Sequence, residues 1–325
     1  MNEKNEYILW WSGGITSAVA CKVAIDLFGK QNCRVIFIDT CNEHPDTYRF
    51  FNDCENLYGI NIDIITGIKD YIPRLKIYKK IFLERSQYFQ PNKNVHFYNI
   101  EDVWKHHISL NVSYGANCST ELKRKVREEW QKENDFKNQI FGFEFNNKEF
   151  KRALSLSLNH PKAKPIFPLL MMAYDKNKCI KLFNYWNVEI PQSYKDGLHN
   201  NNCLGGNYGC VQGGIGYWQK LYRINREGYL KRAKIEHELS DEAGFQVTMC
   251  KEQSEDAKAL ENKKDALLFL LPHPEYPQNK TVLDVQAREP KPMVDCMGFC
   301  GTLDLSERNE TEKEINKQTE LFNNQ

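Results

Sequence analysis

Short apolar runs alternate with helical patterns through the first 143 residues, and this alternation constrains the fold more than any other feature. Strand-like runs cover residues 7–11, 34–39, 60–65 and 139–143. Amphipathic helical patterns lie between them, at residues 15–28, 45–58 and 120–133. Strands joined through helices pair in parallel, with right-handed crossovers. The sequence therefore predicts a doubly wound α/β sheet that is covered by helices on both faces.

The pattern changes near residue 170, and we expect three regions. Residues 1–170 should form the α/β domain, residues 171–305 a mainly helical region that carries cysteines, and residues 306–325 a charged tail. One long polar helix is expected around residues 217–239. A basic insertion at residues 70–99 contains "RLKIYKKIFLER", which has helical periodicity. A solvated helix face is the simpler interpretation of this insertion, and a nucleic-acid-binding or lid element is the alternative.

The turn between the first strand and the first helix consists of Ser12, Gly13, Gly14, Ile15, Thr16 and Ser17. Glycines here let backbone N–H groups face an anion, and the helix N-terminus adds partial positive charge. The sequence has no Gly-Lys-Ser/Thr ending, so this is not a Walker loop, and it lacks the third glycine of a dinucleotide fingerprint. We predict a phosphate-binding turn, hereafter the phosphate turn (residues 12–17). A tight turn without a ligand is the alternative.

The chain has 11 cysteines, and its N-terminus does not resemble a signal peptide. Metal binding or thiol chemistry is therefore favoured over a disulfide framework. Four cysteines lie in apolar periodic segments and are expected in the core: Cys21, Cys33, Cys54 and Cys179. Two close pairs, Cys203 with Cys210 and Cys296 with Cys300, have the arrangement of a four-thiolate zinc or iron–sulfur site. Cys118 is a fifth candidate, because an expected helix start and a basic run beside it favour a reactive thiolate.

Charge and hydropathy limit the classes of partner. The formal net charge is +1, so binding to a polyanion needs a local patch. One expected helix offers such a patch through Lys123, Arg124, Lys125, Arg127 and Lys132. The longest later apolar run, residues 266–271, is too short to span a bilayer. We expect a cytoplasmic protein with no membrane association.

Several segments, taken in order, resemble the phosphoadenosine phosphosulfate (PAPS) reductase-like family of the PP-loop, or adenine nucleotide alpha-hydrolase, superfamily. The phosphate turn resembles the PP-motif Ser-Gly-Gly-x-Asp/Thr-Ser. The other segments are Ile38-Asp39-Thr40 with residues 44–50, Cys118 with Leu122-Lys123, Gly142-Phe143-Glu144 with Glu149 and Arg152-Ala153, Pro168-Leu169, and the loop of Cys203 and Cys210. The resemblance covers roughly residues 7–220. It implies a five-stranded parallel sheet that binds an adenine nucleotide at the carboxyl ends of its strands.

The resemblance also implies roles for individual residues. The phosphate turn would hold the pyrophosphate of ATP with Mg²⁺, and Asp39 would meet the nucleotide or the metal. Lys123 and Arg152 would balance phosphate charge, and Gly142 would line the nucleotide site. Thr16 stands where the motif usually has Asp, and a neutral hydroxyl is a poor Mg²⁺ ligand. The mode of metal binding is therefore left open.

Two chemistries share this fold. ATP pyrophosphatases split ATP between its alpha and beta phosphates and adenylate a substrate oxygen, and sulfur then displaces AMP. Sulfonucleotide (PAPS/APS) reductases instead reduce an activated sulfate, with a cysteine such as Cys300 as nucleophile. The complete Ser-Gly-Gly and Ser17 favour the first. A nucleotide-binding sensor or scaffold subunit is the non-enzymatic alternative.

A further resemblance concerns residues 213–218, "GGIGYW", which are similar to a stretch of DNA phosphorothioation proteins. It implies a [4Fe–4S] cluster on Cys118, Cys203, Cys210 and one of Cys296 and Cys300. Zn²⁺ and unligated thiols are the alternatives. Nucleic acid as the substrate, and a cysteine desulfurase or another sulfur donor as partner, follow from the same resemblance.

Overall fold

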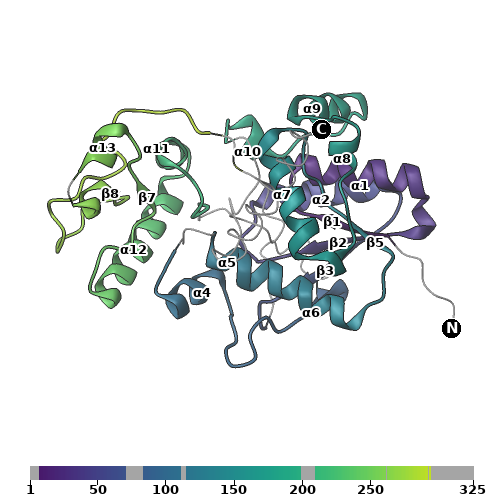
Figure 1. Cartoon of the computed structure of the whole chain (residues 1–325), viewed down its shortest axis with the longest axis horizontal. Helices are drawn as coiled ribbons and strands as arrows, with labels where there is room; N and C mark the ends of the chain where they lie inside the picture. Colours follow the sequence, from purple (N-terminus) through teal and green to yellow (C-terminus); the bar gives the residue numbers. More distant parts are fainter. Residues whose placement is uncertain are drawn as a thin grey trace, which may run out of the picture.

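The computed structural model describes residues 7–70, 83–110, 115–198, 209–260, 262–291 and 293. Its centre is a parallel sheet of six strands in the order β4-β3-β2-β1-β5-β6 (Figure 1). The strands are β1 (Tyr7–Trp11), β2 (Cys33–Ile38), β3 (Ile62–Thr66), β4 (Ser86–Tyr88), β5 (Asn138–Ile140) and β6 (Pro165–Ile166). The predicted α/β class with a parallel sheet is confirmed.

The predicted number of five strands is wrong, because the sheet has six. The four apolar runs of the sequence correspond to β1, β2, β3 and β5. The edge strands β4 and β6 contain three and two residues, and their sequences Ser-Gln-Tyr and Pro-Ile show no alternating pattern. Each pairs with only one neighbour, so burial imposes little on its sequence.

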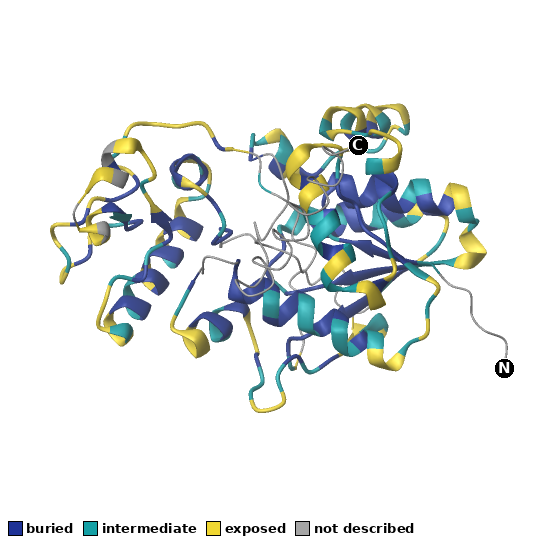
Figure 2. Ribbon diagram, viewed as in Figure 1, coloured by how far each residue is buried: buried dark blue, intermediate teal, exposed yellow. Residues whose placement is uncertain are grey.

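Alternate residues of β1 pack into two different layers. Leu9 and Trp11 belong to one buried cluster, with side chains of α1 (Ile15–Phe28) and α2 (Pro45–Tyr58). Ile8 and Trp10 belong to a second cluster, with α6 (Val126–Glu133) and α7 (Asn147–Asn159). Figure 2 shows the central strands buried between these helices. The sheet is therefore covered on both faces, as the sequence predicts.

The remaining helices fall into two sets: those up to residue 195 belong to the α/β part, and those from residue 215 onward belong to a second group of elements (Figure 1). They are α4 (Ile100–His107), α5 (Asn117–Ser119), a π-helical segment (Thr120–Lys125), α8 (Pro168–Met171), α9 (Lys176–Tyr185), α10 (Gln192–Lys195), α11 (Ile215–Ile224), α12 (Arg226–Ala243) and α13 (Glu255–Ala259). Short 3₁₀ turns occur at Lys30–Asn32, Pro161–Ala163 and Lys263–Ala266. An antiparallel pair, β7 (Cys250–Lys251) and β8 (Leu267–Leu268), completes the second group.

The second group lies at the far end of the long axis from the sheet (Figure 1). It contacts the α/β part through α12 and α4, where the Arg232 guanidinium stacks 4.1 Å from the Trp104 ring centroid. Lys105 and Glu238 form an ion pair of 3.5 Å across the same joint. The joint is mainly apolar, since both parts contribute to one buried cluster.

Two segments of the chain differ from the predictions or lie partly outside the described residues. The single helix expected around residues 217–239 is two helices, α11 and α12, which are separated at Asn225. The side chain of Asn225 accepts the Gly228 N–H, so it caps α12. Residues 71–82 of the basic insertion lie outside the described residues, whereas its residues 83–99 lie within them and include β4. Among the described residues, no helix combines the length and apolar character needed to cross a bilayer.

Candidate nucleotide site

The phosphate turn begins directly after β1, at the carboxyl end of a central strand. Gly13 has a φ of +83°, a conformation that residues with a Cβ rarely adopt. Gly14 is extended and is the N-cap of α1, where no side chain caps the helix. The N-cap residue therefore offers no side-chain oxygen to the first N–H groups of α1, as is common where a helix start binds an anion.

Ser17 holds the phosphate turn in shape. Its buried hydroxyl accepts the Ser12 N–H at 3.0 Å and the Ser12 hydroxyl at 2.9 Å, and it donates to the Gly14 carbonyl at 2.9 Å. These bonds tie both ends of the turn together. The position of Ser17 in the motif thus has a structural role in addition to any contact with phosphate.

Gly142 follows β5 and packs directly on the first turn of α1. A Cβ at this position would lie 2.4 Å from the Ser17 Cα and 2.6 Å from the Ser17 nitrogen, so only glycine fits. The structure therefore brings Gly142 against the phosphate turn. The sequence prediction placed it at the nucleotide site on resemblance alone.

Asp39 follows β2, the strand that pairs with β1, and is fully buried. Its carboxylate accepts the Cys41 N–H at 2.8 Å and the Tyr48 hydroxyl at 3.1 and 3.2 Å. Burial and the charge of Asp39 raise the pKa of Tyr48, so the phenol stays protonated and donates a hydrogen bond to the Asp39 carboxylate. Asp39 thus lies at the same sheet edge as the phosphate turn.

The two predicted phosphate-neutralising cations both have carboxylate partners. Lys123 Nζ lies 3.3 Å from Glu43 Oε1, and both side chains are almost fully buried. Arg152 Nη1 contacts both Glu149 oxygens at 2.7 Å, and its guanidinium lies over the Phe143 ring. Each pair is close to neutral. Phosphate bound beside either cation would therefore have to compete with its carboxylate.

Arg127 is a buried cation of α6. It is 2% exposed, and its guanidinium lies 6.0 Å from the Phe141 ring centroid. Burial lowers its pKa to about 9. The residue belongs to the basic run of the sequence, but its burial excludes it from a surface patch.

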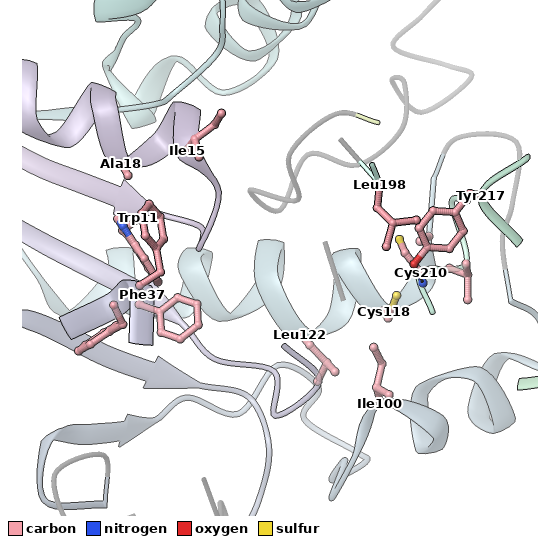
Figure 3. Packing of buried hydrophobic residues seen from close by; sticks show 14 of the residues in the cluster. Trp11, Ile15, Ala18, Phe37, Ile100, Cys118, Leu122, Leu198, Cys210 and Tyr217 are labelled. Carbon is pink, nitrogen blue, oxygen red and sulfur yellow. Dashed lines mark hydrogen bonds between the residues drawn. The ribbon is translucent and has the colours of Figure 1, made fainter. Parts of the chain in front are cut away.

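Of the five candidate cluster ligands, only Cys118 and Cys210 lie in the described residues. Both are buried and belong to the larger core cluster, and Figure 3 draws them near each other beside Leu198 and Tyr217. The Tyr217 hydroxyl accepts the Cys210 N–H at 3.1 Å, which holds that turn. Two buried thiols in an apolar setting suit two ligands of a thiolate-held group. Within the described ranges, no three His, Cys, Asp or Glu residues are arranged to hold a metal.

The core cysteines are confirmed. Cys21, Cys54 and Cys179 are buried and Cys33 is half-buried. Burial raises the pKa of Cys54 to about 12 and that of Cys33 to about 11, so these thiols stay protonated. Their chemistry is that of packed apolar side chains.

Sequence reasoning missed Tyr194 of α10. Its hydroxyl oxygen lies 3.3 Å from the Ile15 nitrogen and accepts the N–H of that residue in the phosphate turn. The two residues are 179 positions apart, and no local pattern distinguishes this tyrosine from the other 15. Only the tertiary fold brings it to the turn.

Residues 6–141 match the model of the phosphoadenosine phosphosulfate reductase domain. The matched part contains the phosphate turn, Asp39, Cys118 and Lys123, and it ends one residue before Gly142. The match supports a PAPS reductase-like, PP-loop assignment and an enzyme that acts on nucleotides. A search of curated proteins found no match to the chain.

Proposed function

We propose that the chain binds ATP at the phosphate turn and splits it between the alpha and beta phosphates, which adenylates a substrate oxygen. The observation that carries this proposal is the turn itself. Gly13 has a positive φ, Gly14 leaves the start of α1 without a side-chain cap, and Gly142 lets β5 approach within contact distance. Such a turn offers backbone N–H groups to a pyrophosphate leaving group.

Each residue of the site then has a task. The N–H groups at the start of α1 bind the beta and gamma phosphates, and Ser17 keeps them oriented through its bonds to Ser12 and Gly14. The Asp39 carboxylate, held by Tyr48 and the Cys41 N–H, accepts a hydrogen bond from the nucleotide or contacts its metal. Mg²⁺ carried with ATP would neutralise charge on the phosphate oxygens. Lys123 and Arg152 would add positive charge at the phosphates if they exchanged their contacts with Glu43 and Glu149 for contacts with phosphate oxygens.

We further propose that the adenylated substrate receives sulfur, with nucleic acid as the substrate class and a cysteine desulfurase or another sulfur donor as partner. The two buried thiols Cys118 and Cys210 support a [4Fe–4S] cluster, with Zn²⁺ as the alternative. Cys203 and one of Cys296 and Cys300 would complete the ligand set; these residues lie outside the described ranges. A cluster bound there would supply electrons or hold sulfur near the site.

The family match favours one other function equally, reduction of an activated sulfate such as PAPS or adenylyl sulfate. In that reaction, a cysteine thiolate attacks the sulfur, the S–O bond to the nucleotide breaks and the nucleotide phosphate leaves. A dithiol then reduces the resulting cysteine S-sulfonate, which releases sulfite and becomes a disulfide. Cys300, the candidate nucleophile, lies outside the described residues. A sensor that binds ATP without cleaving it is the remaining alternative.

One assay separates these functions. Protein purified without oxygen is incubated with Mg²⁺ and ATP labelled at the alpha phosphate, with and without DNA or RNA. A parallel reaction contains PAPS or adenylyl sulfate and a dithiol reductant. Pyrophosphate in the first reaction, with the labelled AMP group joined to the nucleic acid or released as AMP, supports the proposal. Sulfite in the second without AMP in the first supports the reductase, and ATP binding without either product supports the sensor.

A further inference from the structure

A segment after α9, residues 189–196, returns across the start of α2 to the phosphate turn. We call it the strap. It contains α10, whose Tyr194 hydroxyl accepts the Ile15 N–H at 3.3 Å. The strap therefore places one phenol on a backbone donor of the turn that the proposed function assigns to phosphate.

The strap is fastened by an ion pair at the start of α2. The Arg49 guanidinium binds both oxygens of Asp46 at 2.7 and 2.9 Å, and it donates to the Glu189 and Ile190 carbonyls at 3.1 and 3.2 Å. Asp46 also accepts the Gln192 N–H at 2.7 Å. The contacts to the strap go to its backbone, so the clamp of Asp46 and Arg49 fixes its path whatever its side chains are.

The ion pair of Asp46 and Arg49 is partly buried, with 22% and 29% of the two side chains exposed. Burial alone would raise the pKa of Asp46, but the Arg49 guanidinium and the Gln192 N–H lower it below its usual value. Ser193, next to Tyr194, is fully buried. Tyr194 is thus held by packing and by a charged clamp, which limits the entropy lost when its hydroxyl meets a ligand.

One cation, Lys176, lies beside Tyr194. Lys176 Nζ lies 5.9 Å from the Tyr194 ring centroid, and the same ammonium pairs with Glu144 at 3.0 Å, two residues after Gly142. A phenol that accepts an N–H can still donate its own proton. Donation to a phosphate oxygen is a hydrogen bond to a charged acceptor, which is stronger than one between neutral groups.

We propose that Tyr194 is a phosphate-binding residue of the site, specific for the pyrophosphate part of the nucleotide, and that the clamp of Asp46 and Arg49 positions it. This inference rests on the proposed binding of ATP at the phosphate turn. It adds a residue of α10 to the site, beyond the match at residues 6–141, and it predicts that the Tyr194 hydroxyl contributes to the binding of ATP and inorganic pyrophosphate but not of AMP.

The test is calorimetric titration of the full chain with ATP, inorganic pyrophosphate and AMP. Tyr194→Phe should weaken binding of ATP and pyrophosphate roughly ten-fold or more, since it removes one hydrogen bond to a charged group. AMP affinity and the thermal unfolding midpoint should stay at their wild-type values. The matched control is Tyr185→Phe on α9, whose side chain is 84% exposed and should leave all three affinities unchanged.

A second variant tests the clamp. Asp46→Ala removes the acceptor of both Arg49 and the Gln192 N–H, and it should reproduce the loss of pyrophosphate affinity. The double variant with Tyr194→Phe should be no weaker than Asp46→Ala, because both changes remove one contact. Additive losses would overturn the positioning role of the clamp.

Two outcomes separate this inference from the proposed function. Wild-type protein that binds no adenine nucleotide contradicts the proposed function itself. Wild-type protein that binds ATP, together with Tyr194→Phe protein of equal pyrophosphate affinity, overturns the role of Tyr194 alone. An equal loss of AMP affinity in Tyr194→Phe would overturn the specificity for pyrophosphate.

Discussion

Gly142 illustrates how one residue without a side chain determines the nucleotide site. The first prediction is that Gly142→Ala separates β5 from α1, because the new Cβ would lie 2.4 Å from the Ser17 Cα. Overpacking of this kind costs about 1–3 kcal/mol of stability. We expect that loss in urea unfolding, together with an ATP affinity reduced at least ten-fold.

Gly214→Ala is the matched control for Gly142→Ala. Gly214 has no heavy atom within 4 Å of its added Cβ and is the N-cap of α11. Alanine is less favoured than glycine at an N-cap, so Gly214→Ala should cost up to about 1 kcal/mol of stability without a steric clash, and ATP affinity should stay at its wild-type value. Wild-type ATP affinity in Gly142→Ala would contradict the placement of the site between β5 and α1.

The second prediction concerns the hydroxyl of Ser17. Ser17→Ala removes three hydrogen bonds that close the phosphate turn, so we expect a stability loss of about 1–2 kcal/mol. ATP affinity should also fall, because the N–H groups of the turn lose their orientation. Ser157→Ala on α7, which removes one bond to the Ala153 carbonyl, is the control and should leave ATP affinity unchanged. Equal ATP binding by both variants would show that Ser17 does not shape the site.

At the residue scale, the sequence predicts those parts of the site whose residues are adjacent in the chain. The phosphate turn can be predicted because the strand end, the glycines and the hydroxyls occupy six successive positions. The contact of Tyr194 with Ile15 cannot, since it depends on the path of the strap. The ion pairs of Lys123 and Arg152 likewise appear only when the fold brings Glu43 to Lys123 and buries Glu149 beside Arg152.

At the scale of the element, we expect the packing of α12 against the turn at residues 271–276 to make the free energy of unfolding depend on pH. His237 Nε2 donates to the Leu271 carbonyl at 3.1 Å, and the His237 and His273 rings are 4.5 Å apart. Burial is the main cause that lowers the pKa of His237 below 6.5. Just below pH 6.5 the His237 ring is therefore still mostly neutral in the folded chain, whereas in the unfolded chain it is mostly protonated.

The third prediction follows from this sign. The contribution of His237 to the free energy of unfolding is present above pH 6.5 and is lost as the pH falls toward the lowered pKa of the folded state. Urea unfolding should show that the free energy of unfolding falls more between pH 7.5 and pH 5.5 for the wild type than for His237→Gln, whose side chain keeps a neutral N–H donor. Equal losses would contradict the assignment.

The comparison with His237→Gln is needed because a neighbour titrates in an overlapping range. Burial raises the pKa of Glu236 to about 8, although the Leu270 and Met249 N–H groups bind its carboxylate. Both proteins contain Glu236, so its contribution cancels in the difference. The wild-type pH profile alone would mix the two groups.

Elements differ in how far their sequences reveal them. The predicted helices at residues 15–28 and 45–58 are α1 and α2 with the same bounds. In α2 the amphipathic pattern records burial on one face. The predicted amphipathic character of α1 is wrong, because residues 15–21 are all buried where α1 packs against β1, α8 and α9. The strands β4 and β6 are too short to carry a pattern, so the sheet has one more strand than expected. The break at Asn225 was missed because the polar pattern continues on both sides of the cap.

At the scale of the whole molecule, the fourth prediction concerns the thiols near the joint between the two parts. If Cys118 and Cys210 ligate a cluster, protein purified without oxygen should contain iron and sulfide and absorb visible light. Cys118→Ser and Cys210→Ser should each lose most of this iron and absorbance. Cys33→Ser is the control, because Cys33 lies half-buried at the start of β2 and should leave the metal content unchanged.

Two results would contradict the cluster. Colourless wild-type protein with one zinc per chain would show that the thiols hold zinc. Variants at Cys118 and Cys210 with wild-type iron content would show that the ligands lie elsewhere. Either result leaves the phosphate turn and its proposed nucleotide unaffected, because the turn is built from β1, α1 and β5.

The most direct test of the central claim is the product of ATP turnover by the full chain. Protein purified without oxygen, supplied with Mg²⁺, alpha-labelled ATP, candidate nucleic acids and a sulfide donor, should release pyrophosphate, with one labelled AMP group joined to the substrate oxygen for each pyrophosphate until sulfur displaces it as free AMP. Gly142→Ala should abolish this release, and Gly214→Ala should retain it. Release of ADP and phosphate, or sulfite from PAPS with no AMP from ATP, would contradict cleavage between the alpha and beta phosphates.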